Sequence, residues 1–294
     1  MNANIQCLTE ACKEAGVPIR PLDEHGNCVE LLIPRVSKHA PNDARTLLPK
    51  KHHFLHSVVP LNLHSWASIA RDKGFTYETL KDAVNLPRTK SFMDPAVPEE
   101  YQAYVKQASQ AEIVADMLSS FSLPFIVKRN SGAMGKNVFL CKTEAEVSAA
   151  VASVFRKDVP GYDYIVLAQE YVNVAREYRV LVLDGQIEVV YEKSKEGATF
   201  VGNLSPLHWD GAKAVLISDE ATISAIAAFI APLFEALPIR WTGLDVALDT
   251  EGKWQLFEIN SAPQVKYLVR DNGKEIMKRV YRKILALLSE EASS

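Results

Sequence analysis

A segment near the C-terminal end, residues 244–260, carries three polar side chains at a spacing that could bind a metal ion. Apolar residues alternate in both halves of the segment, which predicts a β-hairpin whose two-residue loop is 251–252. With that loop, Asp245 lies opposite Glu258, and Asn260 shares a face with Glu258. Facing Cβ atoms are about 4.5–5.5 Å apart, so the two carboxylates repel each other unless a cation lies between them. Such oxygen ligands suit Mg²⁺ or Mn²⁺, and Mg²⁺ usually bridges to substrate phosphates, so the hairpin predicts a metal site that works with a nucleotide.

The alternative is a solvated hairpin face with ordinary surface acids. It explains Asp245 or Glu258 alone, but it explains poorly why two carboxylates face each other beside Asn260. A loop one residue longer or shorter would break the facing pair, so the interpretation depends on the register of the hairpin.

A second candidate site is a loop of small residues that includes Ser131, Gly132 and Gly135 and lies between two predicted strands. Glycines let the backbone approach a ligand closely and turn N–H groups toward an anion. Lys128, at the end of the first strand, supplies a positive charge for phosphate. The loop is not a P-loop, because Asn137 stands where Ser or Thr is needed and a strand follows in place of a helix. An ordinary turn is the alternative.

The elements that must position these residues indicate an α+β protein, because strand and helix patterns interleave without regular βαβ alternation. Thr143 and Glu146 form a capping box that opens a helix to about residue 155. Further helices are predicted at 6–15, 66–72, 76–85, 101–121, 220–236 and 274–288. Strands are predicted at 29–33, 125–128, 137–141, 164–170, 178–183, 187–193 and in both arms of the hairpin, and 91–98 is interpreted as a breaker.

The segment 34–56 is polar and rich in Lys, Arg and His, and it is predicted to be a long loop. Loops of that length usually bind something or are disordered. A basic cluster within it could bind an acidic substrate or a metal, although a solvated loop is the plainer interpretation. The members of that cluster are Lys50, Lys51, His52, His53 and His56.

The composition excludes several classes of protein. The 294 residues carry 36 acids and 33 bases, a net charge of −3, which argues against a polybasic nucleic-acid binder. No run approaches the roughly 20 apolar residues that cross a bilayer, and the N-terminus has no secretory pattern. The four cysteines form no C-x-x-C pair, so reduced thiols are expected. We expect a cytoplasmic protein without a nucleic-acid or membrane partner.

Taken together, these residues resemble the ATP-grasp superfamily of carboxylate–amine ligases, over about residues 64–290. The order along the chain that carries this resemblance is Asp72-Lys73, Lys128 with its glycine loop, Gln169-Glu170-Tyr171-Val172, Asp245, and Glu258-Ile259-Asn260-Ser261-Ala262-Pro263. Within the superfamily the chain is most similar to ribosomal-protein S6 glutamate ligases and to the ATP-grasp region of cyanophycin synthetase. Glu177-Tyr178-Arg179 before a strand and Asn203-Leu204 before a small-residue stretch are the basis for that subgroup.

The resemblance implies an ATP-grasp fold, in which two α+β subdomains clasp ATP. It implies subdomains at 65–168, with the glycine loop, and 169–294, with the metal site, while 1–64 is a candidate substrate-binding region. It implies cofactor-binding roles for Lys73, Lys128, Ser131, Gly132 and Gly135 on the phosphates, for Gln169, Glu170, Tyr171 and Val172 on adenine, and for Glu177 on ribose. It implies catalytic roles at the transferred phosphate for Arg179, Lys193 and Asn203, and Mg²⁺ or Mn²⁺ ligation by Asp245, Glu258 and Asn260.

The chain departs from the family in three places. Leu244 stands where D-alanine–D-alanine ligases have an arginine, and Gln264 stands where a glycine usually follows the last proline. The N-terminal portion matches no substrate domain of the family with certainty.

The implied activity is an ATP-dependent ligase that forms an amide or peptide bond through an acyl phosphate, with a glutamate-like amino acid as substrate. Small molecules or short peptides are the expected substrates, and the oligomeric state is left open. The alternatives are an ATP-grasp phosphotransferase and a non-catalytic nucleotide-binding module. Intact Asp245, Glu258 and Asn260 argue against the module.

Overall fold

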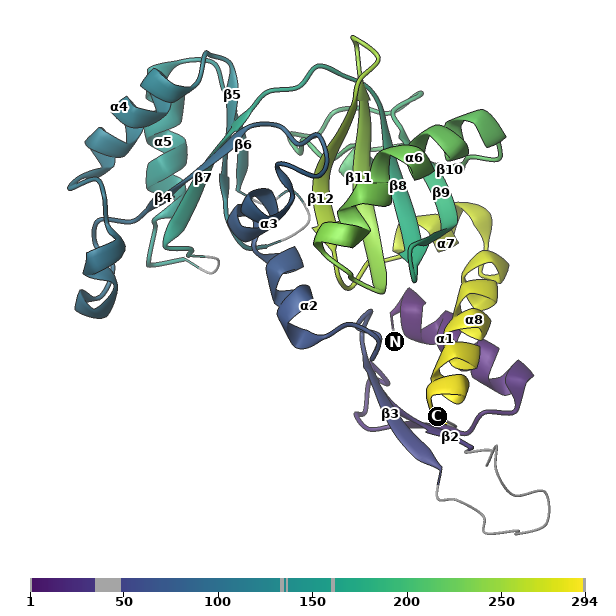
Figure 1. Cartoon of the computed structure of the whole chain (residues 1–294). Coiled ribbons are helices and arrows are strands. Elements are labelled where there is room, and N and C mark those ends of the chain that lie inside the picture. The colour runs from purple at the N-terminus through teal and green to yellow at the C-terminus, as the bar shows by residue number, and fades with distance from the viewer. Residues whose placement is uncertain (1, 35–48, 133–134, 136, 160–161, 293–294) are drawn as a thin grey trace.

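The computed structural model describes residues 2–34, 49–132, 135, 137–159 and 162–292. Within these residues the strands form three sheets, each antiparallel throughout, and helices cover them (Figure 1). The sheet orders are β1-β2-β3, β4-β7-β5-β6 and β10-β9-β8-β11-β12. The expected α+β class is therefore confirmed.

The elements have the following bounds. The helices are α1 (Ala3–Ala15), α2 (His64–Arg71), α3 (Lys73–Leu80), η1 (Glu99–Tyr104), α4 (Gln110–Ser120), α5 (Glu144–Val154), η2 (Pro206–His208), α6 (Glu220–Ala236), α7 (Lys266–Asn272) and α8 (Glu275–Ala292). The strands are β1 (Ile19–Pro21), β2 (Cys28–Ile33), β3 (Lys50–Leu55), β4 (Thr89–Met93), β5 (Phe125–Arg129), β6 (Val138–Cys141), β7 (Ile165–Glu170), β8 (Val174–Leu183), β9 (Gln186–Ser194), β10 (Lys213–Leu216), β11 (Trp241–Asp249) and β12 (Trp254–Asn260). None of these helices is long and apolar enough to span a lipid bilayer.

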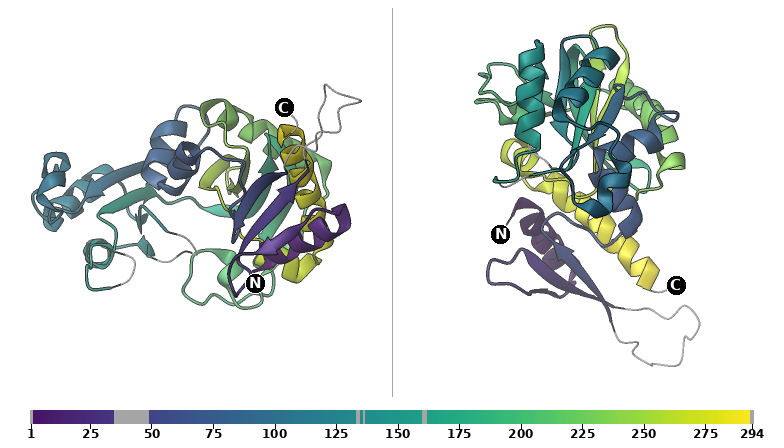
Figure 2. Two further views of the ribbon diagram at one scale, coloured as in Figure 1. Left: turned by 90° about the horizontal axis from the view of Figure 1, so that it is seen from below. Right: turned by 90° about the vertical axis from the view of Figure 1, so that its left-hand side faces the viewer.

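The five-stranded sheet lies between two hydrophobic cores, because its central strands are apolar on both faces. Val180 and Val182 of β8 pack with α6, whereas Leu181 and Leu183 pack with α1 and α8 (Figures 1 and 2). Trp241, at the start of β11, is fully buried in the second of these cores. The N-terminal and C-terminal helices therefore cover one face of this sheet together.

The four-stranded sheet forms a separate lobe with α4 and α5, and it has a core of its own. The capping box is confirmed, since the Thr143 side chain accepts from the N–H of Glu146 and the Glu146 carboxylate accepts in return. Strand β7 of this lobe passes through residues 171–173 directly into β8 of the larger sheet. The two sheets are thus joined by a three-residue connection.

The prediction that 34–56 is one long loop is wrong for its last part, because residues 50–55 form β3 and pair with β2. His52 is buried against the core, whereas Lys51 and His53 point to the other face and pair with Glu30. The sequence Lys-Lys-His-His does not indicate a strand, because apolar and polar residues do not alternate in it. Residues 35–48 lie outside the described part of the chain.

Two other predicted elements need correction. Residues 89–93, which overlap the supposed breaker, form β4 with Phe92 buried, and the prolines follow after the strand has ended. The helix predicted at 101–121 begins only at Gln110, because the Ser109 side chain caps it by accepting from the N–H of Glu112. Strands β1 and β10 and helix α7 were not predicted, as they are only three, four and seven residues long.

The loop that follows β12 is held by the N-terminal part of the chain. Asn4 of α1 is fully buried, donates to the Pro263 carbonyl at 3.0 Å and accepts from the N–H of Val265 at 3.3 Å. Ser57, after β3, donates to the Ala262 carbonyl at 2.8 Å. Asn62 donates to the Ser261 carbonyl at 3.4 Å. Asn4, Ser57 and Asn62 therefore form a scaffold for this loop.

We predict that Asn4→Leu lowers the free energy of unfolding by about 2–3 kcal/mol, because it leaves the buried Pro263 carbonyl and Val265 N–H without partners. Tyr281→Phe is the matched control, since the Tyr281 hydroxyl accepts from the same amide at 3.1 Å but has no hydrogen bond to the described residues of the loop. Its expected effect is about 1 kcal/mol. Urea unfolding of both variants measures the difference, and equal effects would contradict the scaffold role.

Candidate active site

Asp245 and Glu258 lie directly opposite each other in the β11–β12 pair, as the hairpin pattern predicted. The loop between the strands is longer than expected, because the Asp249 N–H already donates to the Lys253 carbonyl across it. Gly252 ends that loop with a φ of 81°, a left-handed conformation that favours glycine. The hairpin thus has a three-residue loop in place of the predicted two-residue one.

A β-bulge restores the facing pair. Near the loop Val246 pairs with Leu256, one step out of the predicted register, and the register shifts between Val246 and Asp245. The extra residue in this bulge is Phe257. A bulge re-aims neighbouring side chains, and both Phe257 and Glu258 line one pocket although they are adjacent in the chain.

Asp245 is surrounded by cations from the neighbouring strands. Arg179 of β8 donates to both of its carboxylate oxygens, at 2.6 and 3.1 Å, and Lys193 of β9 lies 2.8 Å away. Lys193 also pairs with Glu177 at 2.5 Å. Burial opposes ionisation of Asp245, yet the charges of Arg179 and Lys193 hold its pKa below the usual value. A Cβ at Gly243 would lie 3.2 Å from the Arg179 guanidinium, so the glycine leaves room for this side chain.

Glu258 pairs with a cation from a different part of the fold. The Lys73 ammonium lies 3.2 Å from the Glu258 carboxylate and donates to the Gly132 carbonyl at 2.8 Å. Lys73 begins α3, Glu258 belongs to β12, and Gly132 belongs to the loop after β5. One lysine thus connects the glycine loop with the strand of the facing carboxylates.

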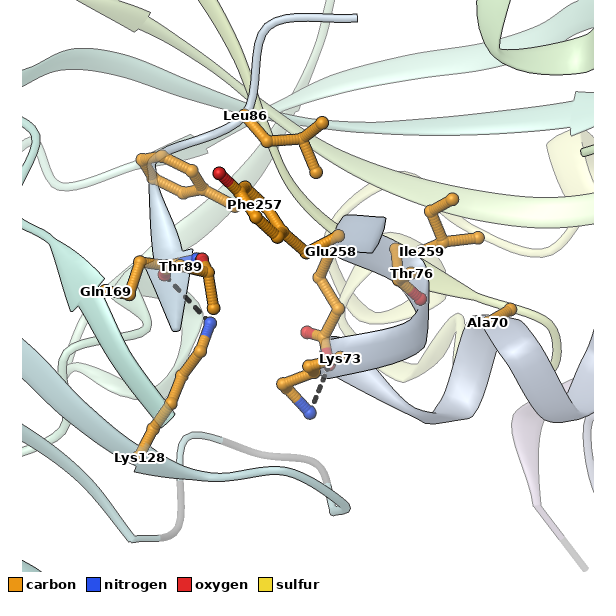
Figure 3. A pocket seen from close by; sticks show the side chains of 11 residues that line it. Ala70, Lys73, Thr76, Leu86, Thr89, Lys128, Gln169, Phe257, Glu258 and Ile259 are labelled. Carbon is orange, nitrogen blue, oxygen red and sulfur yellow. Dashed lines mark hydrogen bonds and ion pairs between the residues drawn. The ribbon is translucent and has the colours of Figure 1, made fainter. Parts of the chain in front are cut away.

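Four of the predicted site residues line one narrow pocket between the two sheets (Figure 3). Lys128 is buried there, and its ammonium donates to the Gln169 side-chain oxygen at 2.8 Å. The Gln169 amide in turn donates to the Thr89 hydroxyl at 2.9 Å, which fixes the orientation of Gln169. Leu86 and Phe257 supply an apolar wall. Lys73, Lys128, Gln169 and Glu258 are brought together as the sequence predicted.

The other glycine-loop residues are only partly free to bind a ligand. Both the N–H and the hydroxyl of Ser131 donate to Asp163, at 2.7 and 2.5 Å. A Cβ at Gly135 would lie 2.3 Å from the Asn203 side-chain oxygen, so Asn203 lies against the glycine loop rather than against Asp245. The remaining loop residues 133, 134 and 136 lie outside the described part of the chain.

The predicted hinge residues occupy the connection between the sheets. Glu170 ends β7, and its backbone N–H and carboxylate interact with Arg88. Tyr171 is exposed and Val172 half-buried in the connection itself. Of the four predicted hinge residues, Gln169 is the one that lines the pocket among the described residues.

The donor set at the hairpin fits a hard divalent cation. Asp245 and Glu258 supply facing carboxylates, and the Asn260 side-chain nitrogen is buried without a partner among the described residues, so that amide is not committed elsewhere. Among the described residues no group of three His, Cys, Asp or Glu side chains is placed so that it could hold a metal ion. A metal here therefore needs oxygen from Asn260 or from a phosphate, which is typical of Mg²⁺.

Three residues that shape this site were not identified from the sequence: Asn130, Thr89 and Phe257. Asn130 donates to Asp72 at 2.6 Å and accepts from the N–H of Gly74 at 2.8 Å, which joins the start of α3 to the base of the glycine loop. The only signal in the sequence was its place directly after the Lys128-Arg129 strand end. Thr89 and Phe257 were missed because a strand start and a bulge are not visible in an apolar pattern.

Comparison with known proteins agrees with this geometry. A family model described as the RimK-like ATP-grasp domain matches residues 88–284. A D-alanine–D-alanine ligase of Haemophilus ducreyi is 26% identical over 198 residues, which cover 67% of this chain and 59% of that protein. An uncharacterized MG012 homolog of Mycoplasma pneumoniae is 25% identical over 193 residues, 64% of this chain and 58% of that protein. The chain thus spans less than two thirds of the length of these curated relatives.

Solved structures show the same fold. A D-alanine–D-alanine ligase from Bacillus anthracis aligns with a TM-score of 0.56 at 16% identity, over 79% of this chain and 70% of that chain. The ATP-grasp ligase PsnB complexed with a minimal precursor aligns with a TM-score of 0.50 at 17% identity, over 77% of this chain and 63% of that chain. The predicted ATP-grasp fold is confirmed. Because the family model matches more than half of the residues of this chain, the chain belongs to the RimK-like ATP-grasp domain family.

Proposed function

We propose that the protein is an ATP-dependent ligase that joins a carboxylate to an amine through an acyl phosphate. The observation that carries the proposal is a pocket with two lysines, Lys73 and Lys128, beside the facing carboxylates Asp245 and Glu258. Burial, and then the charge of Lys73, lower the pKa of Lys128 to about 8. A buried lysine held next to a second lysine is costly for the fold, and a polyanion such as a nucleotide phosphate chain would relieve that cost.

The site residues divide into a nucleotide side and a reaction side. We assign Lys73, Lys128 and the glycine loop to the phosphates, the 169–172 segment to adenine and Glu177 to ribose. Asp245, Glu258 and Asn260 would hold Mg²⁺ or Mn²⁺. Such an ion supplies charge neutralisation to phosphate oxygens when bound. The solved ligases with ATP, or with Mg and ADP, are relatives in fold that support this assignment.

The proposed reaction has two steps. An oxygen of the donor carboxylate attacks the γ-phosphorus of ATP, ADP leaves, and an acyl phosphate forms. The amine then attacks the acyl carbon and inorganic phosphate leaves. Arg179 and Lys193, with Asn203 at the glycine loop, would stabilise the negative charge that gathers on the transferred phosphate.

The finer assignments are also proposals. We propose subdomains at 65–168 and 169–294, and the passage between the sheets at 171–173 supports that division. Substrates would be small molecules or short peptides with an amino-acid, glutamate-like carboxylate, in the cytoplasm. One ligase among the relatives is named for D-alanine, and another is solved in complex with a precursor peptide, which supports this substrate class.

Lys128→Met should show how much the positive charge of Lys128 lowers the free energy of unfolding. The pKa of Lys128 in the fold, about 8, is below its value in the unfolded chain, so the charged lysine destabilises the fold below pH 8. That penalty fades as the pH rises through about 8 to 10.5. We expect Lys128→Met to raise the free energy of unfolding by about 2 kcal/mol at pH 7 and by less than half of that at about pH 9.5.

Urea unfolding at both pH values measures this effect. Lys142→Met is the matched control, because Lys142 is exposed on the same lobe. It should change stability little at either pH. A Lys128→Met protein that is no more stable than the wild type at pH 7 would contradict the proposed charge balance.

The activity itself is tested by incubating the protein with Mg-ATP and a matrix of amino acids and short acidic peptides, while ADP and phosphate are followed. We expect phosphate release that requires both a carboxylate and an amine and stops when EDTA removes the metal. Asp245→Asn should lower the rate at least a hundredfold, because it removes a charge that the metal needs. Glu251→Gln, an exposed carboxylate in the same hairpin, is the matched control and should retain the rate.

ADP that appears with a phosphorylated product and without free phosphate would favour the phosphotransferase. ATP binding without turnover across the whole matrix would favour the nucleotide-binding module. Either result would overturn the ligase proposal.

A further inference from the structure

Lys73 has two partners that a phosphate-binding lysine does not need. Its ammonium lies 3.2 Å from the Glu258 carboxylate and donates to the Gly132 carbonyl at 2.8 Å, with only 16% of the side chain exposed. The lysine therefore neutralises one of the two facing carboxylates.

The lysine is fixed at its base. Asp72 caps α3 by accepting from the N–H of Phe75, and Asn130 binds both Asp72 and the N–H of Gly74. These bonds hold the start of α3 at the foot of the glycine loop. The backbone of Lys73 is therefore held within reach of both Glu258 and Gly132, while its flexible side chain can exchange one partner for another.

The second carboxylate is occupied as well. Asp245 is bound by Arg179 and Lys193, and Lys193 is shared with Glu177. Together with Lys73, Lys128 and Glu258, these described side chains form a set of four cations and three carboxylates, which leaves one positive charge over. A free divalent cation would raise that charge to three in a half-buried site. A divalent cation carried on a nucleotide diphosphate or triphosphate would lower it.

We propose that the Lys73 ammonium holds the place of the metal ion at Glu258, so that the site accepts a divalent cation together with a nucleotide phosphate chain and excludes the free ion. This inference rests on the proposed function, because it takes the facing carboxylates as the metal–nucleotide site. When the phosphates arrive, Lys73 exchanges the Glu258 carboxylate for a phosphate oxygen and keeps its bond to the Gly132 carbonyl. Glu258 is thereby released to the cation.

The exchange gives Lys73 two effects of opposite sign. Its charge weakens binding of a metal ion without nucleotide, and the same charge strengthens binding of nucleotide without metal. A lysine that bound phosphate and lay apart from Glu258 would have the second effect alone. The two binding constants of Lys73 variants therefore distinguish the two roles.

The test measures Mn²⁺ binding by electron paramagnetic resonance in the full-length protein without nucleotide. We expect Lys73→Met to bind Mn²⁺ about tenfold more tightly than the wild type, a difference of about 1.4 kcal/mol. We expect Lys73→Arg to bind Mn²⁺ as weakly as the wild type, because it retains the charge. In EDTA, Lys73→Met should bind ADP about tenfold more weakly than the wild type.

Lys253→Met is the matched control, because Lys253 pairs with exposed Glu251 in the loop of the same hairpin. It should change neither constant. Mn²⁺ affinity that is unchanged or lower in Lys73→Met, in a protein whose thermal unfolding matches the wild type, would overturn the proposal. Lys73→Gln serves as a second neutral variant if Lys73→Met does not fold.

The result is separable from the fate of the proposed function. If none of the variants bound ADP while Lys73→Met gained Mn²⁺ affinity, the nucleotide assignment would be wrong, and only the occupation of Glu258 by Lys73 in place of a metal ion would stand. If all bound ADP normally and Lys73→Met gained no Mn²⁺ affinity, the exchange would be wrong and the nucleotide assignment would stand.

Discussion

The repulsion between Asp245 and Glu258 is the interaction on which the rest of the site depends. Two carboxylates that face each other across adjacent strands destabilise a sheet unless cations balance them. The fold supplies those cations from three directions: Arg179 from the neighbouring strand β8, Lys193 from β9, and Lys73 from α3. Each of these elements is held in place by its own apolar packing, so the charge balance is built into the architecture.

The same balance of charges accounts for the meeting of the four-stranded and five-stranded sheets at the β11–β12 hairpin. The four-stranded sheet brings Lys128 and the Gly132 carbonyl toward the hairpin, and the three-residue connection at 171–173 keeps the lobes adjacent. Gln169 orients Lys128 from the end of β7, just before that connection. The pocket between the lobes thereby gathers positive charge opposite an apolar wall, an arrangement that suits a nucleotide with a flat base and a charged tail.

Much of this site could be predicted from residue types and order, because its facing carboxylates belong to strands with clear apolar alternation. The facing pair of Asp245 and Glu258 was predicted correctly, yet for an incomplete reason: the loop is longer than the pattern indicated, and the bulge at Phe257 compensates. A bulge depends on local packing and leaves no mark in the alternation of the sequence. Helix α6 could be placed within a residue because it is long and strongly apolar.

The N-terminal region could be predicted only in part: helix α1 and strand β2 follow local patterns, but β3 and the contacts to the loop after β12 depend on the rest of the chain. Strand β3 has four polar residues in succession, and its pairing with β2 became visible only in three dimensions. Asn4 binds Pro263 and Val265, more than 250 residues away, and no local pattern indicates such a partner. The family match begins at residue 88, so neither this scaffold nor Lys73 lies within it.

The central claim is that the facing carboxylates and the paired lysines form one metal–nucleotide site. The most direct measurement is a crystal structure of the protein with Mg²⁺ and a non-hydrolysable ATP analogue. We expect Mg²⁺ at about 2.0–2.1 Å from oxygens of Asp245, Glu258 and a phosphate, with both Lys73 and Lys128 on phosphate oxygens. A bound analogue whose phosphates point away from the hairpin, with Lys73 still paired to Glu258, would contradict the account.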